Sequence, residues 1–272
     1  MEPLHLLITG AASGIGRAAA ELFVSQGHRV YGIDAAGSAA PLPFPLFTAD
    51  ITDEGALLAI RERLEREEVI LDGILNIAGI HCMTSLVEGD YPRMKRLVDV
   101  NLTGTMLVNR VFHPRLAPKG RILIVTSEVA SFDPMPFNGR YNVTKTALDC
   151  YAQALRQELN LIGQTVVTVR PGAVSTPLSS GSVDSTRTLA DTTRLYQRQA
   201  KNFSSLAARF MGTPIKPEVL AGVICTAMTA KHPRLIYQKH RNPGLVGLSL
   251  LPKRWQCAVI KFLLGLNLPG SF

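Results

Sequence analysis

Tyr141 and Lys145 stand four residues apart in the segment Tyr141-Asn142-Val143-Thr144-Lys145, which puts a phenol and an ammonium group on one face of a helix. A free tyrosine has a pKa of about 10, too high for a base at neutral pH. A lysine cation nearby favours the phenolate and lowers that pKa. The pair therefore predicts that Tyr141 transfers a proton to or from a substrate as a general acid or base.

The hydroxyl of Ser127 strengthens this interpretation, because a Tyr-x-x-x-Lys pattern alone often arises by accident. Ser127 follows the apolar run Ile122-Leu123-Ile124-Val125, which indicates a buried strand. Ligands of α/β proteins bind at the carboxyl ends of such strands. We therefore expect the Ser127 hydroxyl to hydrogen-bond the substrate oxygen.

A glycine-rich turn, Thr9-Gly10-Ala11-Ala12-Ser13-Gly14-Ile15-Gly16, lies between the first expected strand and the first expected helix. Gly10 permits the tight turn, Gly14 lets the backbone approach a pyrophosphate, and Gly16 lets the helix pack closely on the strand. The N-terminus of that helix offers free N–H groups and a positive dipole end to phosphates. Strand, turn and helix occur in the required order, so the turn predicts a dinucleotide site.

Asp34 follows directly on the second expected strand and bears on the choice of cofactor. A carboxylate there accepts hydrogen bonds from the adenosine ribose and repels a 2′-phosphate. Neither Ala35 nor Ala36 brings a positive charge, and Arg17 is the one nearby cation. These features predict NAD rather than NADP. The alternative is an Asp34 that is solvated and caps a turn.

Alternating strand-like and helix-like segments must position these side chains. The expected strands are residues 4–8, 29–33, 45–48, 73–76, 121–126, 165–169 and 234–237. The expected helices are residues 14–26, 53–68, 92–112, 141–161 and 217–230. The alternation predicts an α/β fold: one doubly wound domain with a central parallel sheet of about seven strands and helices on both faces.

Two segments interrupt this alternation. Residues 174–216 contain no expected strand, and helical spacing runs through their centre at 189–211. An insertion of this length at the ligand edge of a sheet predicts a substrate lid. Everything after Gln238 is basic and apolar. We therefore divide the chain into a catalytic domain over residues 1–238, with its lid at 174–216, and an extension over 239–272.

Five motifs fall in the order typical of the short-chain dehydrogenase/reductase family, and the chain resembles that family over residues 4–238. They are the glycine turn, Asp50 with Ile51, Asn76-Ile77-Ala78-Gly79, the group Asn101, Ser127, Tyr141 and Lys145, and Pro171-Gly172 with Thr176. The resemblance implies a Rossmann-type domain and a catalytic tetrad of Asn101, Ser127, Tyr141 and Lys145. It further implies that Lys145 binds the nicotinamide ribose, that Asn101 supports a proton-relay water and that Thr176 binds the carboxamide.

The same resemblance implies a wider set of cofactor contacts, which the positions of the family motifs define. These residues are Gly10, Ser13, Gly14, Ile15, Gly16, Asp34, Asp50, Ile51, Asn76, Ala78, Gly79, Tyr141, Lys145, Pro171, Gly172, Val174 and Thr176.

Two positions depart from the family pattern. Ile77 replaces an asparagine on the structural side of its motif, and Glu128 stands where a small residue is usual. The carboxylate of Glu128 either contacts substrate or points to solvent, and the residues leave both alternatives open. His81 follows the Asn76 motif and is interpreted as a loop histidine with satisfied hydrogen bonds.

The substrate pocket is expected between Ser127 and Tyr141, where Phe132, Met135 and Phe137 lie, although core packing would also explain these three residues. With a lid that is apolar on one side, they predict a bulky apolar alcohol or ketone. The tail resembles those of hydroxysteroid and retinol-type family members, which favours a steroid- or retinoid-like substrate. The alternatives are an NADP-dependent acyl-carrier ketoreductase and a non-catalytic dinucleotide-sensing scaffold.

Composition narrows the partners. The formal charge of the 272 residues is +8, but seven basic residues and no acidic one follow Glu218, so the excess lies in the tail and no nucleic-acid surface is predicted. Four separated cysteines without zinc spacing predict no metal and indicate free thiols in a reducing compartment. No apolar run reaches the roughly 18 residues of a membrane span. We expect a cytoplasmic homodimer or homotetramer that acts on a small molecule.

The tail carries an amphipathic pattern from Pro252, which can begin a helix. One expected face is basic, with Arg254, Cys257 and Lys261. Such a helix beds into a membrane surface as a peripheral contact, or it packs on its own domain or across a dimer; both readings stay open. The expected apolar face consists of Trp255, Val259, Phe262, Leu263 and Leu266.

Overall fold

Seven parallel strands form one sheet in the order β3-β2-β1-β4-β5-β6-β7, as the computed structural model of the chain shows over residues 2–38, 40–210 and 213–265. The predicted fold class is therefore confirmed. The strand order reverses between β1 and β4, and the ligand site of a doubly wound sheet lies at this switch point. The strands are β1 (His5–Thr9), β2 (Arg29–Asp34), β3 (Leu46–Thr48), β4 (Leu71–Asn76), β5 (Leu116–Val125), β6 (Thr165–Pro171) and β7 (Ile236–Lys239).

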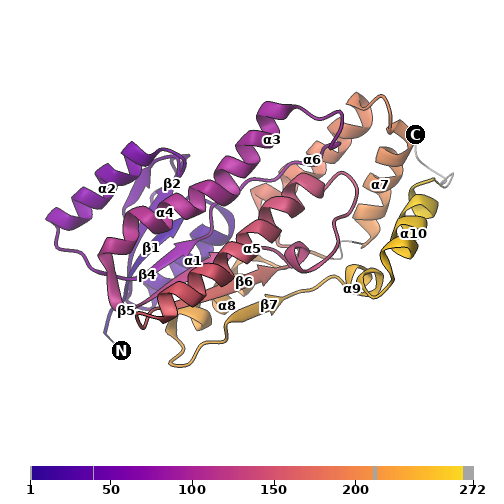
Figure 1. Ribbon diagram of the computed structural model, residues 1–272. Helices are drawn as coiled ribbons and strands as arrows, with labels where there is room; N and C mark the ends of the chain where they lie inside the picture. Colours follow the sequence, from indigo (N-terminus) through magenta and orange to yellow (C-terminus); the bar gives the residue numbers. More distant parts are fainter. Residues whose placement is uncertain (1, 39, 211–212, 266–272) are drawn as a thin grey trace.

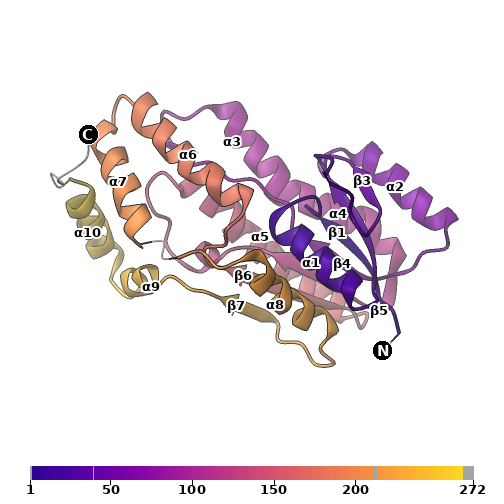
Figure 2. The same cartoon turned by 180° about the vertical axis from the view of Figure 1, so that it is seen from behind.

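Each central strand sends successive apolar side chains to opposite faces of the sheet. In β1, Leu6 packs against helices α1 (Gly14–Ser25) and α8 (Pro217–Thr229). The next residue, Leu7, belongs to the other core, with α2 (Glu54–Arg66), α4 (Thr105–Phe112) and α5 (Gly139–Asn160). Figure 1 looks onto the face that α4 and α5 cover, and Figure 2 looks onto α1 and α8.

The expected helix over residues 92–112 is divided by one turn of wider winding. Helix α3 (Tyr91–Val98) runs into a π-helical turn, η1 (Asp99–Gly104), which continues into α4. Single π turns inside helices occur often at functional sites. Here the turn contains Asn101, one of the predicted site residues, and buries it completely. Two short 3-10 turns, η2 (His113–Arg115) and η3 (Glu128–Ser131), flank β5.

The segment expected to form the lid, called the lid segment below, consists of two helices, so the prediction of one helix over residues 189–211 is wrong. Helix α6 (Pro177–Thr192) ends before α7 (Gln197–Phe210) begins. The carboxylate of Glu88 accepts hydrogen bonds from the backbone N–H groups of Arg194 and Leu195, at 2.9 and 3.2 Å, and from the Thr193 hydroxyl. These donors are held by a residue over a hundred positions away, which stops the helix at this point. Met211 lies outside the described residues.

The extension folds back on the lid segment through α9 (Pro243–Ser249) and α10 (Lys253–Gly265). Leu264 and Ile260 of α10 join Phe203 of α7 in a third apolar cluster, at the end of the molecule where Figures 1 and 2 place α6, α7 and α10. The described helices include none that has both the length and the apolar character to cross a bilayer.

The expected apolar face of the tail helix is wrong in its orientation. Gln256 and Leu264 are buried, whereas Trp255 and Phe262 are about two thirds exposed, at 65% and 66%. The side-chain amide of Gln256 donates to the Leu251 carbonyl at 2.8 Å, so a polar residue is satisfied inside the interface. Leu266 lies outside the described residues. The outward side of α10 therefore combines aromatic and basic side chains.

Candidate active site

A cavity of about 230 Å³ opens at the switch point between β1 and β4. It brings together most of the residues expected to contact the cofactor: Gly10, Ser13, Gly14, Ile15, Gly16, Asp34, Asp50, Ile51, Ala78, Gly79 and Thr176. Six others stand outside its wall, and two of these, Tyr141 and Lys145, lie beside it and are described below. Asn76 is buried and donates to the Asn109 side chain at 2.8 Å, while Pro171, Gly172 and Val174 belong to the end of β6 and the segment after it.

The glycines of this cavity are required by geometry. Gly10 has a φ of +71°, a conformation that L side chains rarely adopt. A Cβ atom on Gly16 would lie 2.0 Å from the carbonyl oxygen of Gly10. Any side chain at Gly16 would therefore push α1 away from the turn. The close approach leaves backbone N–H groups of the first helical turn facing the cavity, which is the cradle that a pyrophosphate needs.

The adenosine end of the cavity is acidic. The Asp34 carboxylate accepts from the backbone N–H groups of Ala12 and Ala36, at 2.9 and 3.0 Å, which fixes its position at the end of β2. Arg17 pairs with Glu21 on its own helix at 2.8 Å and does not line the cavity. The cation that the sequence suggested as a competing influence is thus engaged elsewhere.

Arg96 lines the cavity and was missed by sequence reasoning. It reaches from α3 to form an ion pair with Asp50 and hydrogen-bonds the Thr52 hydroxyl at 3.1 Å. Burial alone would raise the pKa of Asp50, but hydrogen bonds from Thr52 and Arg96 outweigh it and lower that pKa. Asp50 is therefore held as a carboxylate. Only the fold brings Arg96 to it, since the two residues lie far apart in the sequence.

The predicted proton-transfer residues gather beside this cavity. Lys145 Nζ lies 5.7 Å from the centroid of the Tyr141 ring and donates to the Val125 carbonyl at 3.2 Å. The Tyr141 hydroxyl shares a hydrogen bond with Ser127. Helix α5 supplies the tyrosine and lysine and β5 ends just before the serine, so two elements bring the three groups together.

Asn101 is fixed by three hydrogen bonds inside the π turn. Its side chain accepts from the Ile80 N–H at 2.8 Å and donates to the Ile80 carbonyl at 2.9 Å and the Thr144 hydroxyl at 3.2 Å. A Cβ on Gly79 would lie 3.2 Å from the Asn101 side chain and 3.6 Å from Lys145 Nζ. Asn101 thus ties the segment after β4 to α5 and lies next to the lysine.

Burial dominates the protonation of the two central groups. It raises the pKa of Tyr141 to about 12, although the hydrogen bond with Ser127 acts in the opposite direction. It lowers the pKa of Lys145 to about 8. Burial therefore keeps the net pKa of Tyr141 above its ordinary value, although a neighbouring lysine alone was expected to lower it. At neutral pH the site holds a neutral phenol, able to donate a proton, beside an ammonium group.

His81 has a hydrogen-bond partner, as expected of a satisfied loop histidine, and it also lies against Tyr141. Its ring meets the Tyr141 ring edge-on, with centroids 4.3 Å apart. A ring nitrogen of His81 pairs with the Asn138 side chain at 2.8 Å. Burial lowers the pKa of His81 and Lys145 lowers it further, against the hydrogen bond with Asn138, which raises it. No local pattern could reveal this contact, because it joins a loop residue to a residue of α5 that lies 60 positions further along the chain.

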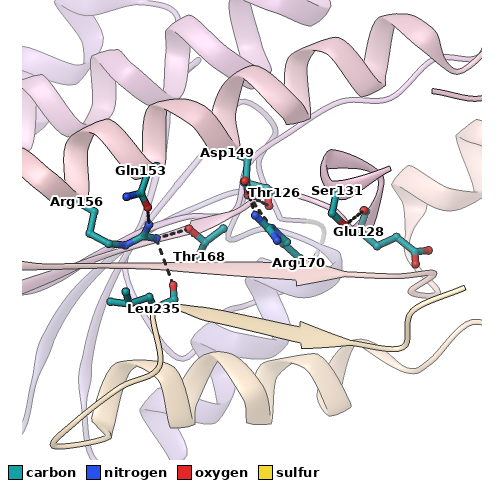
Figure 3. A network of polar contacts seen from close by, with 9 residues as sticks. All are labelled: Thr126, Glu128, Ser131, Asp149, Gln153, Arg156, Thr168, Arg170 and Leu235. Atoms are coloured by element: carbon teal, nitrogen blue, oxygen red, sulfur yellow. Dashed lines mark hydrogen bonds and ion pairs between the residues drawn. The ribbon is translucent and has the colours of Figure 1, made fainter. Parts of the chain in front are cut away.

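A polar network holds α5 against the sheet (Figure 3). Arg170 of β6 pairs with Asp149 of α5 through Nε and Oδ1 at 2.9 Å, and the Thr126 hydroxyl donates to the same carboxylate at 3.4 Å. About two turns further along α5, Arg156 donates to the Thr168 hydroxyl at 2.8 Å. These bonds set the rotation of α5, and with it the direction of Tyr141 and Lys145.

Glu128 follows neither of the two alternatives left open by the sequence. Its side chain is 8% exposed, and its carboxylate accepts from the backbone N–H of Asn242 at 2.6 Å. Burial raises the pKa of Glu128. A Cβ on Gly172 would lie 1.7 Å from the His240 carbonyl oxygen, so the extension runs directly across this edge. Glu128 therefore joins the loop after Ser127 to the C-terminal extension.

The three residues expected to line the substrate pocket, Phe132, Met135 and Phe137, contact two different parts of the protein. Phe137 packs edge-on against Tyr196 and Phe203 of the lid segment, at 5.6 and 5.5 Å between centroids, and Met135 packs against the same cluster. Phe132 lies under the guanidinium of Arg241, 5.0 Å away. Phe137 and Met135 thus face the lid segment, while Phe132 meets the extension.

A doubly wound sheet with a phosphate-binding turn and a buried tyrosine–lysine pair beside it defines an oxidoreductase that uses a nucleotide cofactor. The sequence model of the short chain dehydrogenase family matches residues 4–186, and the chain belongs to that family.

Two relatives illustrate its range. The chain is 30% identical over 182 residues to the NADPH-dependent 1-acyldihydroxyacetone phosphate reductase of Schizosaccharomyces pombe, a match that covers 64% of this chain and 61% of that protein, less than two thirds of its length. It is 26% identical over 238 residues to the 3-ketodihydrosphingosine reductase of Bacteroides thetaiotaomicron, covering 86% of each.

Solved structures agree in fold. A short chain dehydrogenase from Burkholderia cenocepacia, in complex with NADP, superposes with a TM-score of 0.72 and 18% identity over 95% of this chain and 97% of that one. A 3-ketoacyl-(acyl-carrier-protein) reductase from Brucella melitensis, complexed with NADH, superposes with a TM-score of 0.68 and 24% identity. The match covers 86% of this chain and 96% of that one. At these identities the two structures show that the fold is shared.

Proposed function

We propose that this protein transfers a hydride between the nicotinamide of NAD(H) and the carbonyl or alcohol carbon of a bulky apolar substrate. The proposal rests on the grouping of Tyr141 with the buried residues Ser127 and Lys145. The three lie beside the cavity that the glycine-rich turn lines. The cofactor supplies or accepts the hydride. Tyr141 donates the proton to the substrate oxygen in reduction and accepts it in oxidation.

The other residues of the group prepare that proton transfer. Ser127 hydrogen-bonds the substrate oxygen and the Tyr141 hydroxyl, so it holds the two in line. Lys145 places a positive charge beside the phenol, which stabilises the phenolate left after protonation. Asn101 keeps the segment after β4 against α5, and so preserves the distance between the lysine and the cofactor cavity. Thr176 faces the same cavity, where we propose that it binds the carboxamide.

Asp34 supports NAD as the cofactor, although one relative is NADPH-dependent by name. Its carboxylate lines the cavity beside Ala35, and Arg17 is paired with Glu21. We expect NAD to exceed NADP in kcat/KM, and Asp34→Ser to narrow that ratio by about tenfold or more, since one repulsive charge is removed. Steady-state kinetics with both cofactors measure it, with Asp72→Ser, at the opposite end of the sheet, as the matched control. A wild type that prefers NADP would overturn this assignment and leave Arg96 as the residue to explain it.

The substrate class rests on the lid segment. Leu189, Phe203 and Phe137 form an apolar cluster next to the segment that follows Ser127. The two relatives above act, by their names, on an acyl lipid and on a sphingoid ketone, which also supports a long or bulky apolar substrate. Purified protein with NAD(H) should therefore turn over sterols, retinoids or long-chain ketones in preference to sugars and short alcohols. Preference for a sugar would contradict the proposal.

We propose in addition that α10 makes a peripheral contact with an anionic membrane surface. Trp255 and Phe262 are exposed on α10, Leu250 is exposed just before it, and Arg254 and Lys261 lie between these residues in the sequence. Interfacial helices combine such an apolar surface with basic residues. Each cation contributes about 1 kcal/mol near an anionic surface, and salt screens it.

Co-sedimentation with phosphatidylserine-containing vesicles tests this contact. Wild type should bind at low salt and release at high salt, and a Trp255→Ser, Phe262→Ser variant should bind about tenfold more weakly, because two apolar side chains are lost from the contact. Val143→Ser, which removes an exposed apolar side chain from α5, has no place in the contact and serves as the control for general surface hydrophobicity. Equal binding of wild type and the double variant would exclude α10 as the contact.

A further inference from the structure

A second cavity of about 530 Å³ lies under the lid segment, away from the dinucleotide site. Its walls come from the segment after His81, the start of α3, the first residues of α5 and the second half of α6. They are mainly polar, unlike the apolar cluster that fills the rest of the lid segment. The lining residues that carry hydroxyl groups are Thr84, Ser85, Ser185, Thr188, Thr192 and Thr193.

Arg140 is the group in this cavity that needs explanation. Its side chain is 6% exposed, and its Nη1 donates to the backbone carbonyl of Asp90 at 2.8 Å. Its Nε is buried without a hydrogen-bond partner. Among the residues that the structure describes, no carboxylate forms an ion pair with it. A buried guanidinium that meets one carbonyl oxygen leaves most of its positive charge uncompensated, which is costly unless an anion completes the site.

The carboxylates nearest in the wall are already used. Glu88 accepts hydrogen bonds from Thr193, Arg194 and Leu195, so its oxygens serve the junction between α6 and α7. Asp90 lies 3.9 Å from Arg93, an exposed residue at the rim. Two arginines therefore line the cavity, and the buried one faces no acidic side chain at ion-pair distance.

Two residues of the cavity wall are sequence neighbours of residues in or against the catalytic group. Arg140 directly precedes Tyr141 on α5, and Cys82 directly follows His81, whose ring contacts the Tyr141 ring at 4.3 Å. The backbone of Thr84 also donates to the Phe137 carbonyl at 2.8 Å, which ties the cavity wall to the loop before α5. A substrate whose carbonyl carbon reaches Tyr141 could extend a polar end into this space.

We propose that this cavity binds an oxyanionic group of the substrate, a phosphate or a carboxylate, with Arg140 as the principal cation. The guanidinium offers a planar fork of N–H donors, which suits either oxyanion, and the hydroxyls of Thr84 and Ser85 lie in the same wall, whereas those of Thr192 and Thr193 already donate to Thr188 and Glu88. The inference deepens the proposed function, on which it rests: the substrate is an apolar ketone with an anionic end. Arg93 at the rim adds a second positive charge on the path into the site.

Two ketones that differ only at one end test the assignment. One long-chain ketone ends in phosphate and its counterpart ends in hydroxyl. Wild type should show a kcat/KM ratio of about tenfold or more in favour of the phosphate, and Arg140→Gln should remove most of that preference. Arg140→Lys should keep part of it, because the charge stays but the fork is lost. Arg66→Gln, which removes an exposed arginine of α2, should leave the ratio unchanged.

Inorganic phosphate provides a readout without turnover. Calorimetric titration of wild type should detect its binding, Arg140→Gln should abolish the signal, and acetate in place of phosphate distinguishes a site for carboxylates. If no ketone is reduced, the proposed function fails, yet phosphate binding that depends on Arg140 still supports the cavity. If Arg140→Gln does not fold, the inference is tested by the ratio of the kcat/KM values for the two ketones, measured in wild type and in Arg140→Lys. An equal kcat/KM for both ketones, or phosphate binding unchanged in Arg140→Gln, overturns the inference.

Discussion

Replacing Tyr141 with phenylalanine is expected to lower kcat by a factor of roughly 10² to 10⁴, the usual contribution of a positioned proton donor. The ring would keep its contact with His81 and its place beside Lys145, so the fold should be retained. Dinucleotide affinity should stay close to wild type, because the pyrophosphate cradle on β1 and α1 is untouched. Only the hydroxyl shared with Ser127 is removed.

Single-turnover hydride transfer, followed by nicotinamide absorbance, and dinucleotide binding by fluorescence titration should be measured side by side. Tyr151→Phe is the matched control. It lies on the same helix, and its hydroxyl accepts from the Asn109 side chain at 3.2 Å, outside the site. Substantial hydride transfer in a folded Tyr141→Phe variant would end the assignment of Tyr141 as the proton donor.

Replacing Lys145 with methionine is expected to abolish turnover and to stabilise the cofactor-free protein. The pKa of Lys145 falls from 10.5 to about 8 on folding, so burial of its charged form costs about 3 kcal/mol at neutral pH. Loss of the hydrogen bond to the Val125 carbonyl lowers the stability of the variant by about 1 kcal/mol, which offsets part of that gain. The variant should therefore unfold with a free energy about 2 kcal/mol higher than wild type at pH 7.

The pH dependence of the free energy of unfolding tests the same lowered pKa of Lys145, and its direction can be predicted. The unfolded chain keeps the Lys145 proton up to higher pH than the folded protein, so the cost of burial is complete below pH 8 and is relieved as pH rises towards 10.5. Tyr141 acts oppositely: its pKa rises from 10 to about 12 on folding, so its contribution to stability is lost above pH 10. Between about pH 8 and 10, wild type should gain stability relative to Lys145→Met.

Urea denaturation of both proteins at pH 7, 8, 9 and 10 would measure this difference. Lys201→Met, an exposed lysine of the lid segment, controls for the loss of one positive charge. If Lys145→Met is less stable than wild type at pH 7, the lysine is stabilised by contacts that outweigh its desolvation, and the reasoning about its pKa is wrong.

Much of the fold could be predicted because the central strands contain successive buried apolar residues that point to opposite faces of the sheet. Leu6 and Leu7 both need a covered face, and only a sheet with helices on each side provides two. The gathering of Ser127, Tyr141 and Lys145 was equally predictable, since strand ends of a parallel sheet meet at one edge. Local spacing was enough in these cases.

The differences arise where distant residues meet. Glu88 ends a helix of the lid segment by accepting from Arg194, and Glu128 holds Asn242 across more than a hundred residues. Their partners are backbone N–H groups, which every residue offers, so nothing in the sequence marks the pairing. Arg96 and Asp50 meet through their side chains, as do His81 and Tyr141. Each pair is far apart in the sequence, so no local pattern predicts the contact. Hydrogen-bond partners fixed by the tertiary fold were therefore beyond the reach of the sequence patterns.

The third apolar cluster has a consequence for how the protein is made. It joins Met83, Phe137 and Phe203 to Leu264, so its last member emerges from the ribosome long after the strands and glycine turn of the dinucleotide half. Contacts between residues so far apart in the chain form slowly, and their apolar partners stay uncovered until then. A nascent chain should thus pass through a stage in which the cofactor half is folded and the lid segment is still a target for chaperones.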